Sequence, residues 1–408
     1  MNRRGLILST GKWLLALAGP GFGHTMAGMK PVAVSPPGAD KSVTLFLCGD
    51  VMTGRGIDQV LPHPGNPLIH EHFMKSALGY VKIAEAVNGS IPRPVDFAYI
   101  WGDALGELDR MDPDLRIINL ETSVTTSDDY WPRKGINYRM HPDNIPMISA
   151  ADIDCCVLAN NHVLDWGYSG LEETLDTLGK AGLQTPGAGR NLEQASAPAI
   201  FDLREKGRVV VFSLASGTSG VPPAWAATHD KAGVNFITDF SPASVNSIAD
   251  QVRALKQPGD IVVLSIHWGG NWGYDVPGEQ REFAHQLIDK AGINVIHGHS
   301  SHHPRGIEVY KDKPIIYGCG DFINDYEGIS GHEPYRGDLS LMYFLDIDPA
   351  NGKLIGLEMV PHQIRKFRLN QASKQDTAWL KHTLNREGQQ FNTGVDLTKD
   401  DLLELRWQ

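Results

Sequence analysis

Short apolar runs alternate with amphipathic segments along most of the chain. The apolar runs are rich in valine, isoleucine and leucine and cover residues 43–50, 115–121, 154–162, 208–216, 260–269, 293–302 and 313–322. Because they are apolar at nearly every position, the pattern predicts strands that are buried on both faces. Between them, the spacing of apolar residues predicts helices over 143–152, 170–182, 241–256 and 278–292. This alternation indicates an α/β fold in which helices cover a sheet core.

One long segment interrupts the alternation near its start. Residues 57–100 lie between the first two predicted strands and contain many prolines and aromatic residues. We expect an inserted loop with one helix near 73–87, and loops of this length are usually functional or flexible.

The C-terminal part of the chain shows a different pattern. After Leu341, apolar and polar residues alternate around Asn351-Gly352, which predicts an antiparallel hairpin. The stretch from about 373 to 408 is expected to be a polar helical tail. We therefore expect a main domain over 43–350 and a C-terminal hairpin and tail over 351–408.

The N-terminus has the features of an export signal. Arg3 and Arg4 precede a moderately apolar run over 6–18, and small residues follow. The pattern predicts a signal peptide over 1–28, of the twin-arginine type, and then a linker over 29–42. The alternative is a disordered tail. We expect the mature protein to be periplasmic or extracellular, without a retained membrane span.

Composition narrows the class of protein. The chain has 408 residues, of which 41% are hydrophobic and 21% charged, as in ordinary globular proteins. Its net charge of −11 argues against a cationic surface for nucleic acid. The four cysteines lie in apolar runs without a CxxC spacing, so we expect buried free thiols. A disulfide between Cys48 and Cys319 is the alternative.

Polar side chains gather where the predicted strands end. They are Asp50, Asn119, Glu121, Asn161, His162, His267, His299, His302 and Asp321. Ligands bind at the carboxyl ends of strands in α/β sheets, so these side chains are expected to converge. Buried carboxylates and imidazoles are costly unless they are paired or bind metal. Mixed nitrogen and oxygen ligands favour Mn, Fe or Zn, and a shared carboxylate would suit a site with two metals.

Each candidate also has a simpler explanation. Asp50 could cap a helix, Glu121 could pair with a surface arginine, and His267 could be a hydrogen-bonded core histidine. His297 and His303 are expected to be bystanders within "HGHSSHH". The histidines of the insertion, His63, His70 and His72, are expected to be non-catalytic, with substrate contact as the alternative.

The ordered motifs carry a family resemblance. "GDVMTGR", "NLETSVT", "ANNHVLDWG", "HWG", "GHSSHHP" and "YGCGDF" each follow a predicted strand. Together they resemble the CapA-type proteins of poly-γ-glutamate capsule synthesis, a family similar in fold to calcineurin-like metallophosphoesterases. The resemblance covers about residues 43–345. It implies a four-layer α/β/β/α sandwich with a metal site at the carboxyl ends of the strands.

The resemblance also implies roles for individual residues. It gives two divalent metals of the Mn, Fe or Zn class and the ligands Asp50, Glu121, Asn161, His267, His299 and His302. Glu121 takes the bridging position. His162 contacts the attacked or leaving group, and Asp165 is expected to orient it. Arg55 would hold an anionic group of the substrate, and Arg133, Lys134 and Asp321 are further expected substrate-binding residues.

Three features differ from the family pattern. "HWGGNW" has Gly270 and Asn271 where a polar residue and a glutamate are common. Gly320-Asp321-Phe322 carries an acid where the family usually has asparagine, which adds a carboxylate near the expected metals. The first motif also lacks the Asp-x-His of ordinary metallophosphoesterases.

These observations predict an exported, metal-dependent protein of poly-γ-glutamate biosynthesis or processing, with hydrolase or transferase chemistry. Its expected partners are an anionic polymer or a small acidic or phosphorylated substrate, with membrane-bound synthase subunits as further partners. One alternative is a general metallophosphoesterase, which the missing Asp-x-His argues against. Another is a non-catalytic capsule-assembly factor.

Overall fold

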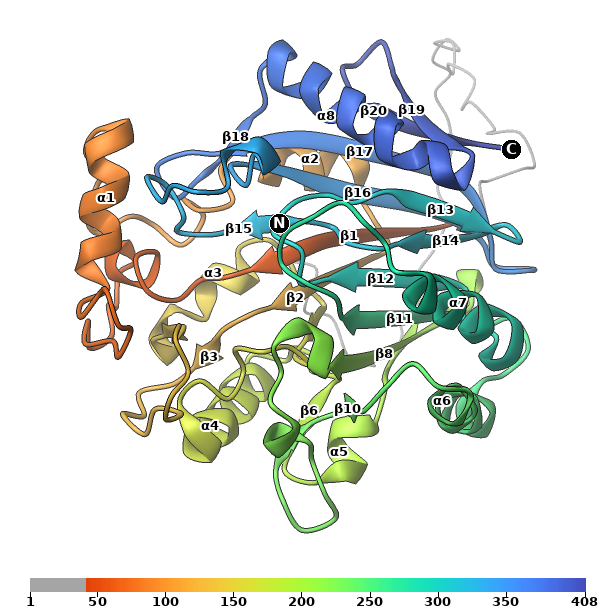
Figure 1. Cartoon of the computed structure of the whole chain (residues 1–408), viewed down its shortest axis with the longest axis horizontal. Helices are drawn as coiled ribbons and strands as arrows, with labels where there is room; N and C mark the ends of the chain where they lie inside the picture. The colour runs from red at the N-terminus through yellow and green to blue at the C-terminus, as the bar shows by residue number, and fades with distance from the viewer. Residues whose placement is uncertain (1–41) are drawn as a thin grey trace, which may run out of the picture. The chain divides into compact units, whose positions relative to one another are not determined.

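Two large β-sheets carry the strands of the computed structural model, which describes residues 42–408 (Figure 1). The nine-stranded sheet has the order β19-β20-β17-β16-β1-β2-β5, with β15 paired to β1 and β18 paired to β17. Its strands are β1 (Val43–Val51), β2 (Leu115–Leu120), β5 (Cys155–Val157), β15 (Asp321–Ile323), β16 (Leu339–Asp348), β17 (Lys353–Ile364), β18 (Leu369–Gln371), β19 (Thr393–Leu397) and β20 (Leu403–Trp407).

The seven-stranded sheet has the order β10-β8-β11-β12-β14-β13, with β7 paired to β8. Its strands are β7 (Ala199–Asp202), β8 (Arg208–Ser216), β10 (Phe236–Ile237), β11 (Ile261–His267), β12 (Val295–His299), β13 (Ile307–Tyr310) and β14 (Lys313–Ile316). Two small sheets pair β3 (Ser123–Val124) with β4 (Arg139–Met140) and β6 (Ala188–Gly189) with β9 (Gly233–Val234).

The helices agree in part with the sequence prediction. They are α1 (Leu78–Asn88), α2 (Ala104–Met111), α3 (Pro146–Ser149), α4 (Gly167–Lys180), α5 (Leu192–Ser196), α6 (Pro242–Leu255), α7 (Gly278–Gln286) and α8 (Lys374–Gly388). The predictions for α4, α6 and α7 are confirmed, and Ser241 caps α6 by accepting a hydrogen bond from Ser244 N at 3.3 Å. The helix predicted over 143–152 reduces to the single turn of α3.

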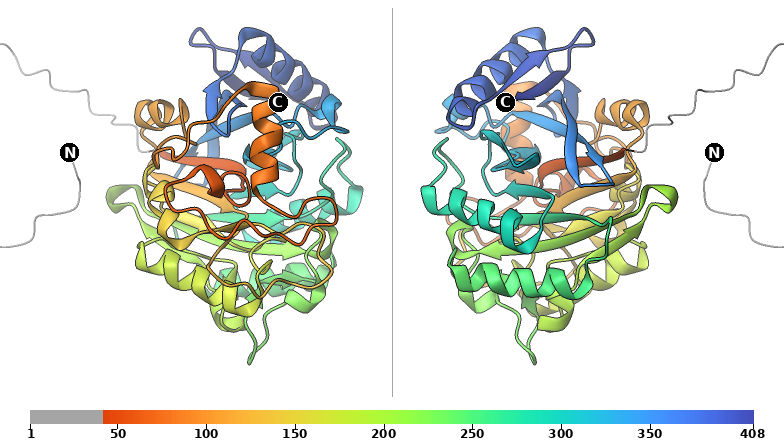
Figure 2. Two further views of the ribbon diagram at one scale, coloured as in Figure 1. Left: turned by 90° about the vertical axis from the view of Figure 1, so that its left-hand side faces the viewer. Right: turned by 90° about the vertical axis from the view of Figure 1, so that its right-hand side faces the viewer.

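Buried side chains explain why the strands are apolar at nearly every position. On β1, Phe46 and Cys48 belong to a core shared with α1, α2, α3 and α4. Leu45 and Leu47 point to the other face and share a second core with the seven-stranded sheet. That sheet packs its other face against α6 and α7. Figure 2 gives two side views of these layers. The prediction of an α/β fold with strands buried on both faces is confirmed.

Two predicted elements are wrong in detail. The apolar run over 313–322 is not one strand, because β14 lies in the seven-stranded sheet whereas β15 lies in the nine-stranded sheet. The chain crosses between the sheets at Tyr317–Gly320, and Gly320 has a positive φ of 81°. The C-terminal tail is helical only as far as α8, because β19 and β20 then form a hairpin on β17.

The predicted hairpin around Asn351-Gly352 is confirmed, since β16 and β17 pair antiparallel on either side of it. The helix of the insertion begins at Leu78 rather than near 73. The cysteines are all free and buried, which confirms the favoured prediction of buried free thiols. Within residues 42–408, no helix is both long enough and apolar enough to cross a membrane. The predicted signal peptide and nearly all of the predicted linker lie outside the described residues.

Parallel strands place the candidate site. Strands β1, β2, β5 and β15 run parallel in one sheet, and β8, β11, β12 and β14 run parallel in the other. In Figure 1 the arrowheads of β1, β11 and β12 point to the same side. Side chains that follow these strands therefore lie at one common edge.

Candidate metal centre

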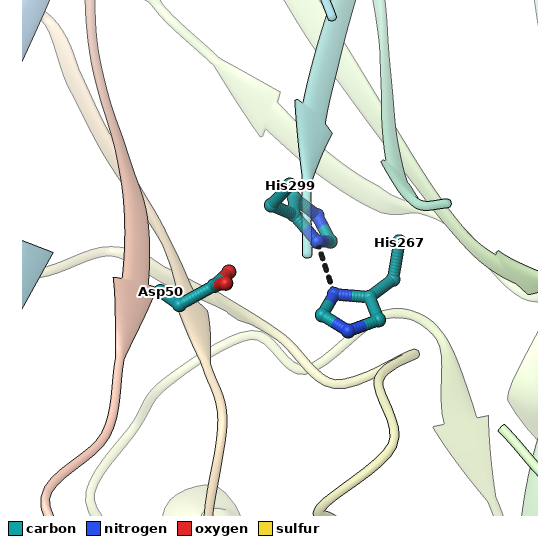
Figure 3. Close-up of side chains that lie close together, drawn as sticks. All are labelled: Asp50, His267 and His299. Atoms are coloured by element: carbon teal, nitrogen blue, oxygen red, sulfur yellow. Dashed lines mark hydrogen bonds between the residues drawn. The ribbon is translucent and has the colours of Figure 1, made fainter. Parts of the chain in front are cut away.

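Side chains from both sheets meet at this edge. Asp50 stands near the end of β1, and His267 and His299 are the last residues of β11 and β12 (Figure 3). One donor atom from each of the three lies within 4.8 Å of the others. His267 and His299 are register partners, and their Nδ1 atoms lie 2.8 Å apart.

A second set of donors adjoins the first. Asp50, His302 and Asp321 also each offer a donor atom within 4.8 Å of the others. His302 Nδ1 lies 2.7 Å from Asp321 Oδ1. Ser300, which has a positive φ of 98°, turns its backbone N–H toward Asp50 Oδ2 at 3.3 Å. The carboxylate of Asp50 is therefore common to both sets.

Glu121 and Asn161 lie on the side of His267. Asn161 Oδ1 is 3.1 Å from His267 Nε2, and Glu121 Oε1 is 3.8 Å from the same nitrogen. Asn119 Nδ2 donates to Asp50 Oδ1 at 2.8 Å. All six residues predicted as metal ligands are thus gathered at one place.

The simpler explanations for Asp50 and Glu121 do not fit, whereas that for His267 agrees with the structure. Asp50 is a strand residue and caps no helix. Glu121 is buried, and its ion-pair partners among the described residues are His162 and His267. His267 is hydrogen-bonded, but its partners are His299 and Asn161, which are themselves candidate ligands.

His162 stands beside the donors with a defined orientation. Its Nδ1 lies 2.6 Å from Asp165 Oδ2, and its Nε2 lies 3.7 Å from Glu121 Oε1. Asn160 Oδ1 accepts hydrogen bonds from the backbone N–H groups of His162 and Val163, both at 3.1 Å, which fixes the turn. The expectation that Asp165 contacts and orients His162 agrees with this geometry.

Lys134 contacts both His162 and Asp165. Its Nζ lies 2.7 Å from Asp165 Oδ1 and 3.0 Å from His162 Nδ1, and it also donates to Ile136 O at 2.9 Å. Its ammonium group is therefore paired with Asp165 and contacts His162. Arg133, by contrast, is exposed and has a positive φ of 61°.

Burial sets the protonation of the donors. Burial and the neighbouring charge of Asp321 raise the pKa of Asp50 to about 7. Burial and Asp50 likewise raise the pKa of Glu121 well above its ordinary value. Burial lowers the pKa values of His267 and His299, so both imidazoles are neutral. Burial alone would lower the pKa of His302, but the charge of Asp321 raises it.

These donors suit a borderline divalent metal. Neutral imidazoles have free lone pairs, and the Nδ1 atoms of His267 and His299 face one another at 2.8 Å. The crowded carboxyl groups of Asp50, Glu121 and Asp321 are each buried. A cation would offset the cost of burying them as carboxylates. Imidazole, carboxylate and amide donors together fit the Mn, Fe or Zn class.

Arg55 is buried and paired with carboxylates, although it also lines the cavity beside the donors. Its Nε donates to Asp325 Oδ2 at 3.1 Å, and Nη1 donates to Glu71 Oε1 at 3.1 Å. Tyr80 lies against the guanidinium with its ring centroid 3.8 Å from Cζ, and its hydroxyl donates to Glu71. Glu71 and Tyr80 belong to the segment 57–100, so Arg55 anchors that insertion beside the first motif.

A cavity of about 530 Å³ opens next to the donors. His302 and Asn271 line it on the side of the donors, and Phe73 of the insertion lines it near the solvent. The cavity could admit part of a substrate to the metal centre.

The predicted bystanders have other partners. His297 Nε2 lies 2.7 Å from the backbone oxygen of Cys48, and His303 Nδ1 lies 3.2 Å from Pro304 O. His70 stacks on the ring of Tyr130, and His63 and His72 are exposed. Neither His297 nor His303 is in a candidate metal group of the described residues.

Several supporting residues were not predicted. Asn271 Nδ2 lies 2.9 Å from His302 Nε2, and Ser265 Oγ lies 2.8 Å from His299 Nε2. Asn271 stands in "HWGGNW", where this chain departs from the family pattern. Asp325 and Glu71 had no signal in the sequence, because their importance depends on contact with Arg55 across the fold.

Comparisons with known proteins agree with the motifs. The family described as bacterial capsule synthesis protein PGA_cap matches residues 44–326. A protein of Mycobacterium tuberculosis named probable polyglutamine synthesis accessory protein is 50% identical over 364 residues, which cover 89% of this chain and 96% of that protein.

More distant relatives carry related names. The PGA biosynthesis protein CapA of Bacillus subtilis is 29% identical over 287 residues, covering 70% of this chain and 64% of that protein. The capsule biosynthesis protein CapA of Bacillus anthracis is 24% identical over 298 residues, covering 70% of this chain and 61% of that protein. With its family match, its relatives and its motifs in agreement, this chain belongs to the PGA_cap family of bacterial capsule synthesis proteins.

Proposed function

We propose that this protein is an exported, metal-dependent enzyme that makes or processes a poly-glutamate polymer. The observation that carries the proposal is the gathering of imidazole, carboxylate and amide donors from two sheets at one edge. The relatives named for capsule and PGA biosynthesis supply the biological setting. Hydrolase or transferase chemistry of the metallophosphoesterase type fits such donors.

The proposed fold is the four-layer α/β/β/α sandwich of those enzymes. Its support is the core that both sheets share, together with the helix-lined cores on their outer faces. The proposed metal ligands are Asp50, Glu121, Asn161, His267, His299 and His302. Bound divalent ions of the Mn, Fe or Zn class would polarise a substrate oxygen and lower the pKa of a bound water.

His162 would move the proton in this reaction. Because Asp165 engages Nδ1 at 2.6 Å, Nε2 is the nitrogen that faces the donors. Burial lowers the pKa of His162 to about 4, so its Nε2 lone pair is available at neutral pH. It would accept a proton from the attacking group and return it to the leaving group.

Positive side chains near the site would serve an anionic substrate in different ways. Arg133 is exposed, and we assign it direct contact with carboxylate or phosphate groups. Lys134 and Arg55 already contact Asp165, Asp325 and Glu71, so we assign them to positioning. The net charge of −11 makes such local cations necessary for a polyanion.

An activity assay tests the enzymatic part of the proposal. Purified protein would be incubated with Mn²⁺ or Zn²⁺ and either a γ-linked glutamate oligomer or nitrophenyl phosphate. We expect turnover that the chelator EDTA abolishes and that falls by at least about 100-fold in His162→Gln. The control His362→Gln changes a buried histidine that bonds to Val360 O in β17. Equal turnover by H162Q and wild type would contradict the role of His162.

The same assay separates the alternatives. Preference for nitrophenyl phosphate over the glutamate oligomer would favour a general phosphoesterase. The printed name of the M. tuberculosis relatives includes "accessory protein", which favours a non-catalytic assembly role as the second candidate. A metal-loaded wild type that turns over neither substrate but retains membrane-bound synthase subunits in a pull-down would support that role.

Export is tested separately. A reporter fused to residues 1–42 should appear outside the cytoplasm, and replacement of Arg3 and Arg4 by lysine should retain it inside. A reporter that stays cytosolic with the native sequence would contradict export.

A further inference from the structure

Two candidate donor sets in the described part of the chain share one carboxylate. Asp50, His267 and His299 form the first set, and Asp50, His302 and Asp321 form the second. Among residues 42–408, Glu121 belongs to neither set. Its Oε1 lies 3.7 Å and 3.8 Å from the Nε2 atoms of His162 and His267. Glu121 nevertheless lies against Asp50, to which its side chain is hydrogen-bonded.

Strand pairing explains why Asp50 and Asp321 are side by side. They are register partners in the parallel pair β1 and β15. Each follows a glycine, and Asp50 N donates to Gly320 O at 3.1 Å. A Cβ built on Gly49 would lie only 1.6 Å from Gly320 O. This close approach of the two backbones requires glycine and holds the two carboxylates next to each other.

Neighbouring buried carboxylates repel, so the pair needs positive charge. Among the described residues, His302 is the ion-pair partner of Asp321, at 2.7 Å. Asn324 Nδ2 donates to the other oxygen of Asp321 at 2.8 Å. One imidazole cannot balance both acids. A divalent cation between Asp50, His302 and Asp321 would balance the charge and use all three as ligands.

We propose that Asp321, together with His302 and Asp50, holds a second cation beside the one that Asp50, His267 and His299 would hold. This inference rests on the proposed metal dependence. It gives Asp321 a definite role as a ligand in place of the substrate contact expected from the sequence. The acid that replaces the family's usual asparagine would thus supply a ligand that this chain's first motif lacks.

Metal titration of the folded protein tests the proposal. Mn²⁺ would be titrated into metal-free wild type and D321N. Calorimetry would measure the number and affinity of bound Mn²⁺ ions, and electron paramagnetic resonance would detect coupled Mn²⁺ pairs. We expect about two Mn²⁺ per chain and a coupled-pair signal in the wild type. In D321N the second Mn²⁺ should bind more than about 100-fold more weakly, and the coupled signal should vanish. Mutation of a residue that merely orients a ligand would lower metal affinity by only about 10–100-fold.

Two further variants complete the design. D50N should lose both ions, because Asp50 belongs to both donor sets. D260N is the matched control, because Asp260 is buried and paired to Arg208 just before the amino end of β11. Circular dichroism and thermal unfolding would establish that each variant is folded.

The outcomes separate this inference from the proposed function. A D321N protein whose second Mn²⁺ is weakened by less than about 100-fold overturns the inference, because Asp321 would then only orient His302. Retention of the coupled pair in D50N also overturns it. A wild type that binds no Mn²⁺ and no Zn²⁺ contradicts the proposed function itself.

Discussion

His162 shows how neighbouring residues determine the state of one side chain. Asp165 and Lys134 contact its Nδ1 at 2.6 Å and 3.0 Å, and Tyr138 meets its ring edge-on with centroids 4.4 Å apart. Burial is the main cause that lowers the pKa of this imidazole to about 4. The folded protein thus favours the neutral ring that the proposed proton transfer needs.

This state of His162 predicts a pH dependence of stability. In metal-free protein, the unfolded state gains a proton on His162 below its ordinary pKa of 6.5, whereas the folded state resists protonation down to about 4. The free energy of unfolding should therefore fall as the pH drops through this window. Relative to H162Q, the wild type should lose up to about 3 kcal/mol.

The measurement is chemical denaturation of both proteins between pH 7 and 4 in the presence of EDTA. H162Q has no titrating ring at this position, so its curve serves as the reference. Curves that stay parallel across the window would contradict the lowered pKa of His162.

At the scale of elements, the contact between β1 and β15 matters most for the site. Gly49 and Gly320 let the two backbones approach, and the register then brings Asp50 and Asp321 together. A methyl group at position 49 would collide with a backbone oxygen, which cannot move aside as a side chain can.

We predict that Gly49→Ala destabilises the protein by at least about 2 kcal/mol, because the two strands must separate. Gly356→Ala in β17 is the matched control, since its Cβ would meet only Asp346 Oδ2, at 3.9 Å. That control should stay within about 1 kcal/mol of wild type. Denaturant unfolding measures both, and equal stability of G49A and wild type would show that the strands tolerate a side chain there.

The elements also show where the sequence pattern is sufficient and where it is not. The apolar runs correctly predicted β1, β2, β8, β11 and β12, because a strand that is buried on both faces must be apolar at nearly every position. The run over 313–322 looked continuous, and its division between two sheets depends on the partners that each half finds. The alternation of Val395, Leu397, Leu403 and Leu405 did contain a strand signal for β19 and β20. We interpreted that stretch as helical with the preceding residues.

At the scale of the whole molecule, the candidate centre depends on packing two sheets together. Asp50 and Glu121 come from one sheet, and His267 and His299 come from the other. Their residue types and positions after strands were enough to predict that they converge. The spacing of the motifs could not show that Asp50 is common to two donor sets or that His302 pairs with Asp321. Both features depend on the strand register.

We propose that the two sheets together assemble a metal centre. Elemental analysis of the purified protein, expressed with Mn²⁺ and Zn²⁺ in the medium, tests it most directly. We predict about two equivalents of metal per chain in the wild type. We expect little or no metal in Asp50→Asn and His299→Asn, and full metal content in the control His362→Asn. A wild type without metal, or full metal content in both site variants, would contradict it.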